Sequence, residues 1–233
     1  MFPLLDQLFS SPLQFLQDML YRIPAVLIAL TMHEWAHGFV AYKLGDPTAK
    51  FMGRLTINPL KHLDPVGAFM LFFLGFGYAK PVPVNPNNFR KKYRDDFLVS
   101  IAGIMMNLLL YLSFITAYFF LDLYIRNNIW YVVTSSFWSA VMPPLIRVIT
   151  GIAIVNLSIA LFNLIPIPPL DGFHVLNDLI LKGNLFVRQQ TAQMGIGLLL
   201  LLSFTGWLGR GLGAVVEAAL DGTFWLLRAI FGV

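Results

Sequence analysis

Three polar side chains stand in an otherwise apolar stretch of the sequence. His33, Glu34 and His37 form "HEWAH" inside residues 24–42, a run long enough to span a membrane as a helix. On a helix, His33 and His37 are four residues apart on one face, so both imidazoles can reach one metal ion. Glu34 is placed to accept a proton from a water molecule at that metal. The spacing predicts a metal site with an adjacent base.

The apolar surroundings of these residues strengthen the prediction. An ionisable side chain near the bilayer centre costs about 2.5 kcal/mol or more. Two core histidines beside a chance glutamate would do nothing to offset that cost, whereas shared metal coordination would. We therefore favour the metal site.

A catalytic zinc site needs a third protein ligand and one open position. Its candidates are His62, His174 and Asp171. Asp171 follows the third apolar run, in the same half of the membrane as the histidine pair, and Pro168 and Pro169 break the helix before it. A carboxylate also suits zinc beside two imidazoles. Asp171 is therefore favoured and the other two are expected to be ordinary polar residues, although spacing alone does not exclude His174.

The composition places this site in a membrane protein. Hydrophobic residues make up 58% of the 233 residues, charged residues make up 12%, and mean hydropathy is +0.72. We expect an all-α polytopic helical bundle with about five to six membrane segments, forming one domain over 1–233 with a core at 24–180 and C-terminal helices at 190–233. The apolar runs are 24–42, 65–79, 97–121, 146–165 and 194–207. The absence of cysteine excludes disulfides and thiolate zinc sites.

The distribution of basic residues predicts the orientation. The net charge is +4, and nine of the 16 Lys and Arg residues lie between residues 43 and 94, whereas 122–145 holds only Arg126. Basic residues that flank apolar runs indicate a membrane protein with the lipid bilayer as partner, and argue against nucleic acid. The positive-inside rule places 43–96 and the metal site toward the cytoplasm. Because a full span at 65–79 would put 80–96 on the wrong side, we expect that segment to be re-entrant.

Two short stretches, "KFMGRLTI" at 50–57 and "AKPVPV" at 79–84, are β-prone or extended. They predict a small extended or β element that could pair with an unwound substrate. Plain connecting structure is nearly as good an interpretation.

The C-terminal stretch carries a narrow polar stripe. Arg210, Glu217, Asp221 and Arg228 fall on one side of a helix that is otherwise apolar. This pattern predicts a helix at the membrane interface or against the bundle.

Two motifs in order resemble the site-2 protease family of intramembrane zinc metalloproteases. They are "HEWAH" and "NLIPIPPLDG" at 163–172. The stretches 53–67 and 75–90 are similar to short prokaryotic members that lack a PDZ domain, and the resemblance covers roughly residues 24 to 180. It implies hydrolysis of peptide bonds in transmembrane or membrane-associated substrates, in regulated proteolysis within a prokaryotic cell membrane, the inner membrane where there are two.

The resemblance also implies roles for individual residues. Zn²⁺ would be held by His33, His37 and Asp171, with Glu34 as the base. Asn163 would polarise the substrate carbonyl or position the substrate, although an amide there could equally cap a helix end or bond to a neighbouring helix.

The chain departs from the family pattern at one place. In "AGIMMN", Ile104 stands where members of the family usually have proline before an asparagine. The departure concerns packing around Asn107, for which we expect an interhelical hydrogen bond.

Other classes fit less well. The chain has no Gly-x-Ser-Gly string for a serine-type intramembrane protease, and its only Gly-Asp, at Gly45 and Asp46, does not fit an aspartyl type. The alternative from a different class is a non-catalytic membrane protein that binds a metal or a partner, which would not need Glu34.

Overall fold

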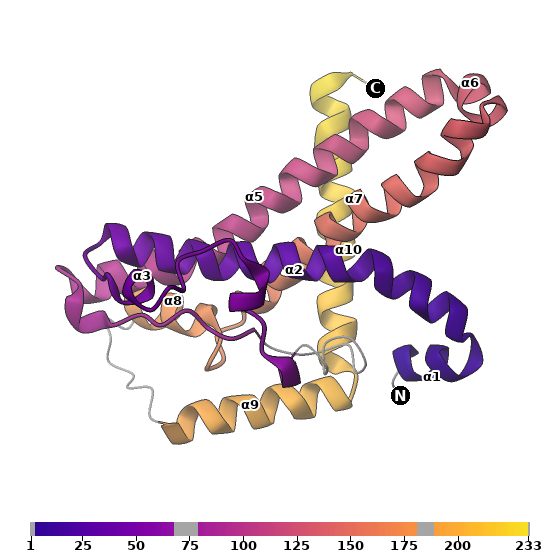
Figure 1. Ribbon diagram of the computed structural model, residues 1–233. Coiled ribbons are helices and arrows are strands. Elements are labelled where there is room, and N and C mark those ends of the chain that lie inside the picture. The colour runs from indigo at the N-terminus through magenta and orange to yellow at the C-terminus, as the bar shows by residue number, and fades with distance from the viewer. Residues whose placement is uncertain (1–2, 68–78, 181–188, 233) are drawn as a thin grey trace.

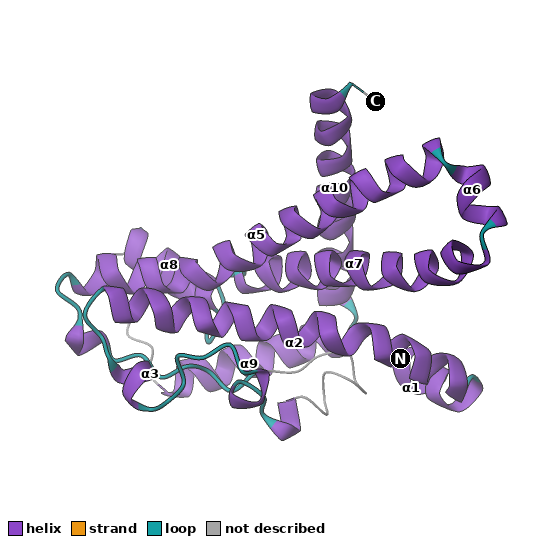
Figure 2. Cartoon of the chain, turned by 45° about the horizontal axis from the view of Figure 1, so that its top comes forward, coloured by secondary structure: helices purple, strands orange, loops and turns teal. Residues whose placement is uncertain are grey.

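The computed structural model describes residues 3–67, 79–180 and 189–232, and most of these residues are helical. Three long helices form the bundle: α2 (Pro12–Lys43), α5 (Lys92–Asn127) and α7 (Ser136–Asn163). They contact one another pairwise, with α5 running opposite to α2 and α7 (Figures 1 and 2). The shorter and C-terminal helices are α1 (Pro3–Ser10), α3 (Thr48–Phe51), η1 (Pro59–Lys61), η2 (Pro86–Asn88), α6 (Ile129–Thr134), α8 (Asp171–Leu179), α9 (Gln189–Phe204) and α10 (Trp207–Phe231).

Local sequence fixes where the long helices begin. Pro12 stands at the first position of α2, where its missing N–H is not needed. Asp95 reaches back to accept a hydrogen bond from the backbone N–H of Lys91, which satisfies a free donor at the start of α5. The Ser135 side chain accepts a hydrogen bond from the backbone N–H of Trp138 at the start of α7.

The long helices are apolar enough to cross a membrane. The described residues contain three such helices, α2, α5 and α7, or up to four if α9 and α10, bent by 78° at their junction, form one broken span. The 36 residues of α5 extend about 54 Å, well beyond a hydrocarbon core of about 30 Å, so its ends project past the apolar layer. An all-helical integral membrane protein is thus confirmed.

The expected count of about five to six membrane segments is not confirmed. Among the described residues, only three to four candidate spans meet the length and composition that a membrane requires. The proposed re-entrant segment at 65–79 lies largely outside the described residues, which stop at 67 and resume at 79.

The small β element is not confirmed either. The described residues contain no strand, only one isolated antiparallel bridge between Leu63 and Ala79. The stretch 50–57 is not extended, because the helix α3 covers its start and turns follow. Residues 80–84 have no regular secondary structure. Prolines at 81 and 83 remove two of the backbone N–H groups that a strand ladder would need.

Side chains from the loops hold the segment 79–88 against the end of α2. The Arg54 guanidinium is buried and donates to the Lys80 carbonyl at 2.7 Å. Buried Asp46 accepts hydrogen bonds from the Asn85 N–H and the Asn88 side-chain amide, both at 2.7 Å. Asp46 therefore does more than form a turn after α2, because it ties that turn to the far end of the segment.

The helix α10 crosses the bundle steeply instead of running alongside it (Figures 1 and 2). Buried Val216 packs into an apolar cluster with Tyr111 and Ile115 of α5 and with Leu157 of α7. The four charged residues of the predicted polar stripe are all exposed. Of the two alternatives that the polar stripe predicted, a helix at the membrane interface or one against the bundle, the packing of Val216 supports the second.

Candidate metal centre

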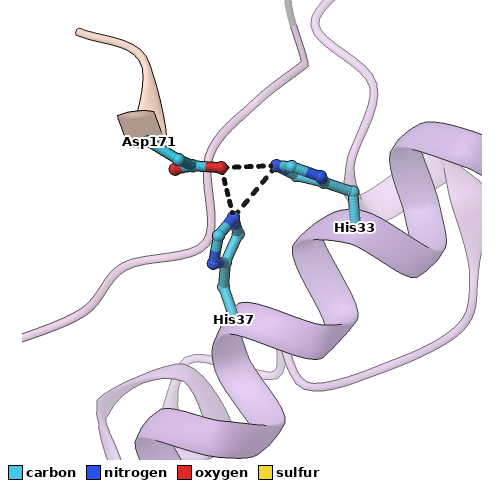
Figure 3. A group of neighbouring side chains, drawn as sticks. All are labelled: His33, His37 and Asp171. Atoms are coloured by element: carbon cyan, nitrogen blue, oxygen red, sulfur yellow. Dashed lines mark hydrogen bonds and ion pairs between the residues drawn. The ribbon is translucent and has the colours of Figure 1, made fainter. Parts of the chain in front are cut away.

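Two imidazoles from α2 and one carboxylate from α8 converge on a single point. The Nε2 atoms of His33 and His37 are 3.0 Å apart, and Asp171 Oδ2 lies 3.1 Å from the first and 3.3 Å from the second. Figure 3 shows the three side chains pointing toward one another, the two histidines from one helix and Asp171 from another. Among the sequence candidates for a third ligand, only Asp171 joins the histidine pair.

A close approach of backbone to backbone positions Asp171. The helix α7 ends at Asn163, and α8 begins at Asp171 itself. A Cβ at Gly172 would lie 2.4 Å from the carbonyl oxygen of Leu164, so a side chain there would push the two segments apart. Glycine after the carboxylate lets the start of α8 fold back on the end of α7.

Hydrogen bonds at the Nδ1 atoms orient both histidine rings. His37 Nδ1 lies 2.7 Å from the carbonyl oxygen of Val99, which can only accept a hydrogen bond. His33 Nδ1 lies 2.6 Å from Asn107 Oδ1. Because each Nδ1 therefore carries a proton, Nε2 is the nitrogen of each ring that is left to bind a metal ion beside Asp171.

Asn107 is the residue whose connection to the site the sequence did not reveal. Its amide nitrogen donates to Asn156 Oδ1 of α7 at 2.8 Å and to the Ala29 carbonyl of α2 at 3.2 Å. The expected interhelical hydrogen bond is confirmed, and its oxygen additionally holds His33. A signal was available, because a polar residue inside an uncharged span suggests a functional partner.

The donor set fits a metal ion. Two Nε2 lone pairs and a carboxylate oxygen face one another, and Asp171 Oδ2 is buried without a hydrogen-bond donor. Three acceptors at this spacing repel one another unless a cation lies between them, and two imidazoles with one carboxylate suit zinc.

Glu34 lies beside this set without joining it. Its Oε2 accepts a hydrogen bond of 2.7 Å from the backbone N–H of Val82, in the segment that Arg54 and Asp46 hold in place. That bond fixes the orientation of the carboxylate and leaves Oε1 to hold a proton.

Gly103 of α5 packs directly against the two imidazoles. A Cβ there would lie 2.5 Å from His37 Nε2 and 2.7 Å from His33 Cε1. Any side chain at this position would displace the rings, so the arrangement of the two histidines requires glycine here.

The remaining candidates lie elsewhere. The Asn163 amide donates to the Ile159 carbonyl of its own helix at 3.0 Å, and its proposed contact with substrate stays a prediction. His62 is fully buried in the loop before the bridge, with Nε2 2.7 Å from the Thr56 carbonyl oxygen, and does not join the histidine pair. His174 is beside Asp96, away from the histidine pair.

The fold and site define a membrane metallopeptidase, and comparison with known proteins agrees. The family model for peptidase family M50 matches residues 21–204, so the chain belongs to that family, which includes the site-2 proteases. YwhC of Bacillus subtilis, named as an inferred zinc metalloprotease, is 38% identical over 211 residues, covering 91% of this chain and 92% of YwhC.

More distant relatives carry a similar name. Rip2 of Mycolicibacterium smegmatis, also named as an inferred zinc metalloprotease, is 26% identical and covers 85% of this chain and 72% of its own. Rip2 of Mycobacterium tuberculosis is 28% identical over 71% of this chain and 60% of its own. No solved structure matches the chain.

Proposed function

We propose that the chain is an intramembrane zinc metalloendopeptidase that cleaves transmembrane or membrane-associated substrates in regulated intramembrane proteolysis. One observation carries the proposal: three metal-ligand atoms converge beside a carboxylate that is not among them. His33, His37 and Asp171 would hold the ion, and Glu34 would act as the base.

The residues around the metal site would have different roles in peptide hydrolysis. Zinc bound there would supply Lewis-acid polarisation of a peptide carbonyl and would lower the pKa of water. Glu34 Oε1 accepts the proton of the attacking water and returns it to the leaving amine. The Val82 N–H keeps its hydrogen bond to Oε2 throughout, so Oε1 keeps its orientation. Asn163, from the end of α7, positions the substrate carbonyl.

The membrane determines which substrates reach the site. The histidine pair lies within a helix that is apolar enough to span the bilayer. A substrate helix must unwind there, because its carbonyls are otherwise bonded within the helix. We further propose that the chain acts as one domain in a prokaryotic cell membrane, an inner membrane where there are two, with the site toward the cytoplasm.

Glu34→Gln tests the proposed reaction. The amide retains an oxygen to accept the Val82 N–H but cannot serve as the base, so cleavage should fall about 10²–10⁴-fold while metal content stays the same. The assay measures new peptide termini by mass spectrometry after the purified protein is reconstituted with a panel of single-span peptides. Glu217→Gln, on the exposed stripe of α10, is the matched control.

The outcomes separate the two classes of function. Equal cleavage by wild type and Glu34→Gln would contradict the role of Glu34 as base. Metal binding without cleavage by the wild type across the whole panel would favour the non-catalytic alternative.

The proposed orientation has its own test. Cysteine is absent from the chain, so single cysteines at Lys92 and Asn127 give clean labelling sites. A membrane-impermeant thiol reagent applied to intact cells should label the Asn127 position and spare Lys92. Labelling of Lys92 from outside would overturn the cytoplasmic placement of the site.

A further inference from the structure

We propose that Asp96, His174 and Asp178 form a second divalent-cation site, which fastens α8 to α5. One ligand atom from each of the three residues lies within 4.8 Å of the others. His174 Nδ1 and Asp96 Oδ2 are 3.5 Å apart. The cluster contains none of the ligands of the first centre.

The spacing of the residues is that of a metal site. His174 and Asp178 are four residues apart in α8 and share one face, as His33 and His37 do in α2. Asp96 comes from the first turns of α5, a helix that packs against α8. Two atoms bound tetrahedrally to one ion at about 2.0–2.1 Å are about 3.3 Å apart, and the distance between His174 and Asp96 is close to that value.

A cation would balance the two carboxyl groups of the cluster. Asp178 Oδ2 is buried and has no hydrogen-bond partner. In the described part of the chain, neither Asp96 nor Asp178 has an ion pair with Lys or Arg. Burial and the neighbouring Asp96 carboxylate raise the pKa of Asp178 to about 7. A metal ion would satisfy both carboxylates and the imidazole together.

The chemistry of the ligands indicates the kind of ion. One imidazole and two carboxylates suit Zn²⁺ or Mn²⁺, whereas an all-oxygen set would favour Mg²⁺ or Ca²⁺. The side chains of His174 and Asp96 are 37% and 23% exposed, so an ion can enter and keep bound water. A proton shared by the carboxylates is the competing occupant.

The position of the cluster gives the ion a role. The first residue of α8 is Asp171, and α5 carries Gly103 and Asn107, which pack against and orient the histidines. An ion that joins α8 to α5 would hold Asp171 at its distance from the histidine pair. This role rests on the proposed function, whereas the existence of the second site does not.

Metal counting on four proteins tests the site. Wild type, Asp178→Asn, His37→Ala and the double variant are purified without a histidine tag, stripped with chelator, loaded with Zn²⁺ and desalted. Elemental analysis should give about two ions per chain for wild type, about one for each single variant and none for the double variant. Asp122→Asn, in an exposed ion pair with Arg126 at the other end of α5, should keep two.

The variants keep the two proposals distinguishable. Wild type and Asp178→Asn both binding one ion, with His37→Ala binding none, would overturn the second site and leave the first intact. His37→Ala keeping every ion while Asp178→Asn loses one would contradict the proposed function but not the second site. If Asp178→Asn does not fold, Asp96→Asn removes a ligand from α5 and must give the same loss. Retention of two ions by that variant would also overturn the site.

Discussion

The two halves of α5 use the same buried stripe for different purposes. Every fourth residue from Gly103 faces inward: Gly103, Asn107, Tyr111, Ile115 and Phe119. At the start of the stripe, Gly103 and Asn107 contact the histidines of α2. Farther along, Tyr111 and Ile115 pack into the apolar cluster with α7 and α10. One helix therefore orients the metal ligands at one end and stabilises the bundle at the other.

The difference shows what each half can tolerate. The site half depends on directed hydrogen bonds at 2.6–2.8 Å, so a change there should alter metal binding before it alters stability. The apolar half depends on packed volume, so a change there should alter stability and leave the metal alone. Substitutions along this stripe test the contrast between the two halves.

The largest effect is expected outside α5, where Asp171→Ala removes a metal ligand. Two imidazoles alone bind zinc weakly, so metal affinity should fall by more than the roughly 10–100-fold typical of an outer partner, and cleavage should drop to background. Metal titration and the peptide assay measure the two losses. Asp122→Ala is the matched control, and full metal retention by Asp171→Ala would mean that another residue completes the site.

The sequence indicated this ligand set because the relevant signals are local or lie in a short motif. Residues four apart on a helix share a face whatever the tertiary fold, so the histidine pair and its adjacent base were readable directly. Asp171 followed from the break at Pro168 and Pro169 and from the motif around it. The positions of the long apolar helices were likewise predictable from hydropathy.

The remaining features depend on how distant segments pack. Asn107 is 74 residues from His33, and their contact is set by the register of α5 against α2. The bond between Glu34 and the Val82 N–H spans 48 residues and depends on an irregular segment. His62 is buried because the loops close over it, which its polar neighbours in the sequence did not indicate. Local patterns carry no information on such registers.

An intermediate effect is expected from Asn107→Ala. The substitution frees His33 to rotate, so metal affinity should fall about 10–100-fold. Ile115→Ala, in the other half of the stripe, should leave metal affinity unchanged and lower stability by about 2 kcal/mol, the low end of the range for soluble cores because lipid also solvates apolar side chains. Metal titration and thermal unfolding of both variants measure the contrast. Equal metal affinities for the two variants would remove the distinction between the halves.

The smallest effect should come from Tyr111→Phe, at the border of the two halves. Its hydroxyl donates to Thr223 Oγ1 of α10 at 2.7 Å, while its ring belongs to the apolar cluster. The substitution keeps the ring and removes one hydrogen bond, which is worth about 0.6 kcal/mol on average between membrane helices. If Tyr111 belongs to the stabilising half, Tyr111→Phe should unfold at a slightly lower temperature with metal affinity unchanged. Tyr111→Ala should be clearly less stable, because it also loses the ring. A fall in metal affinity for Tyr111→Phe would instead show that α10 helps to set the register of α5 and that the polar half extends one turn further than the hydrogen bonds to His33 indicate.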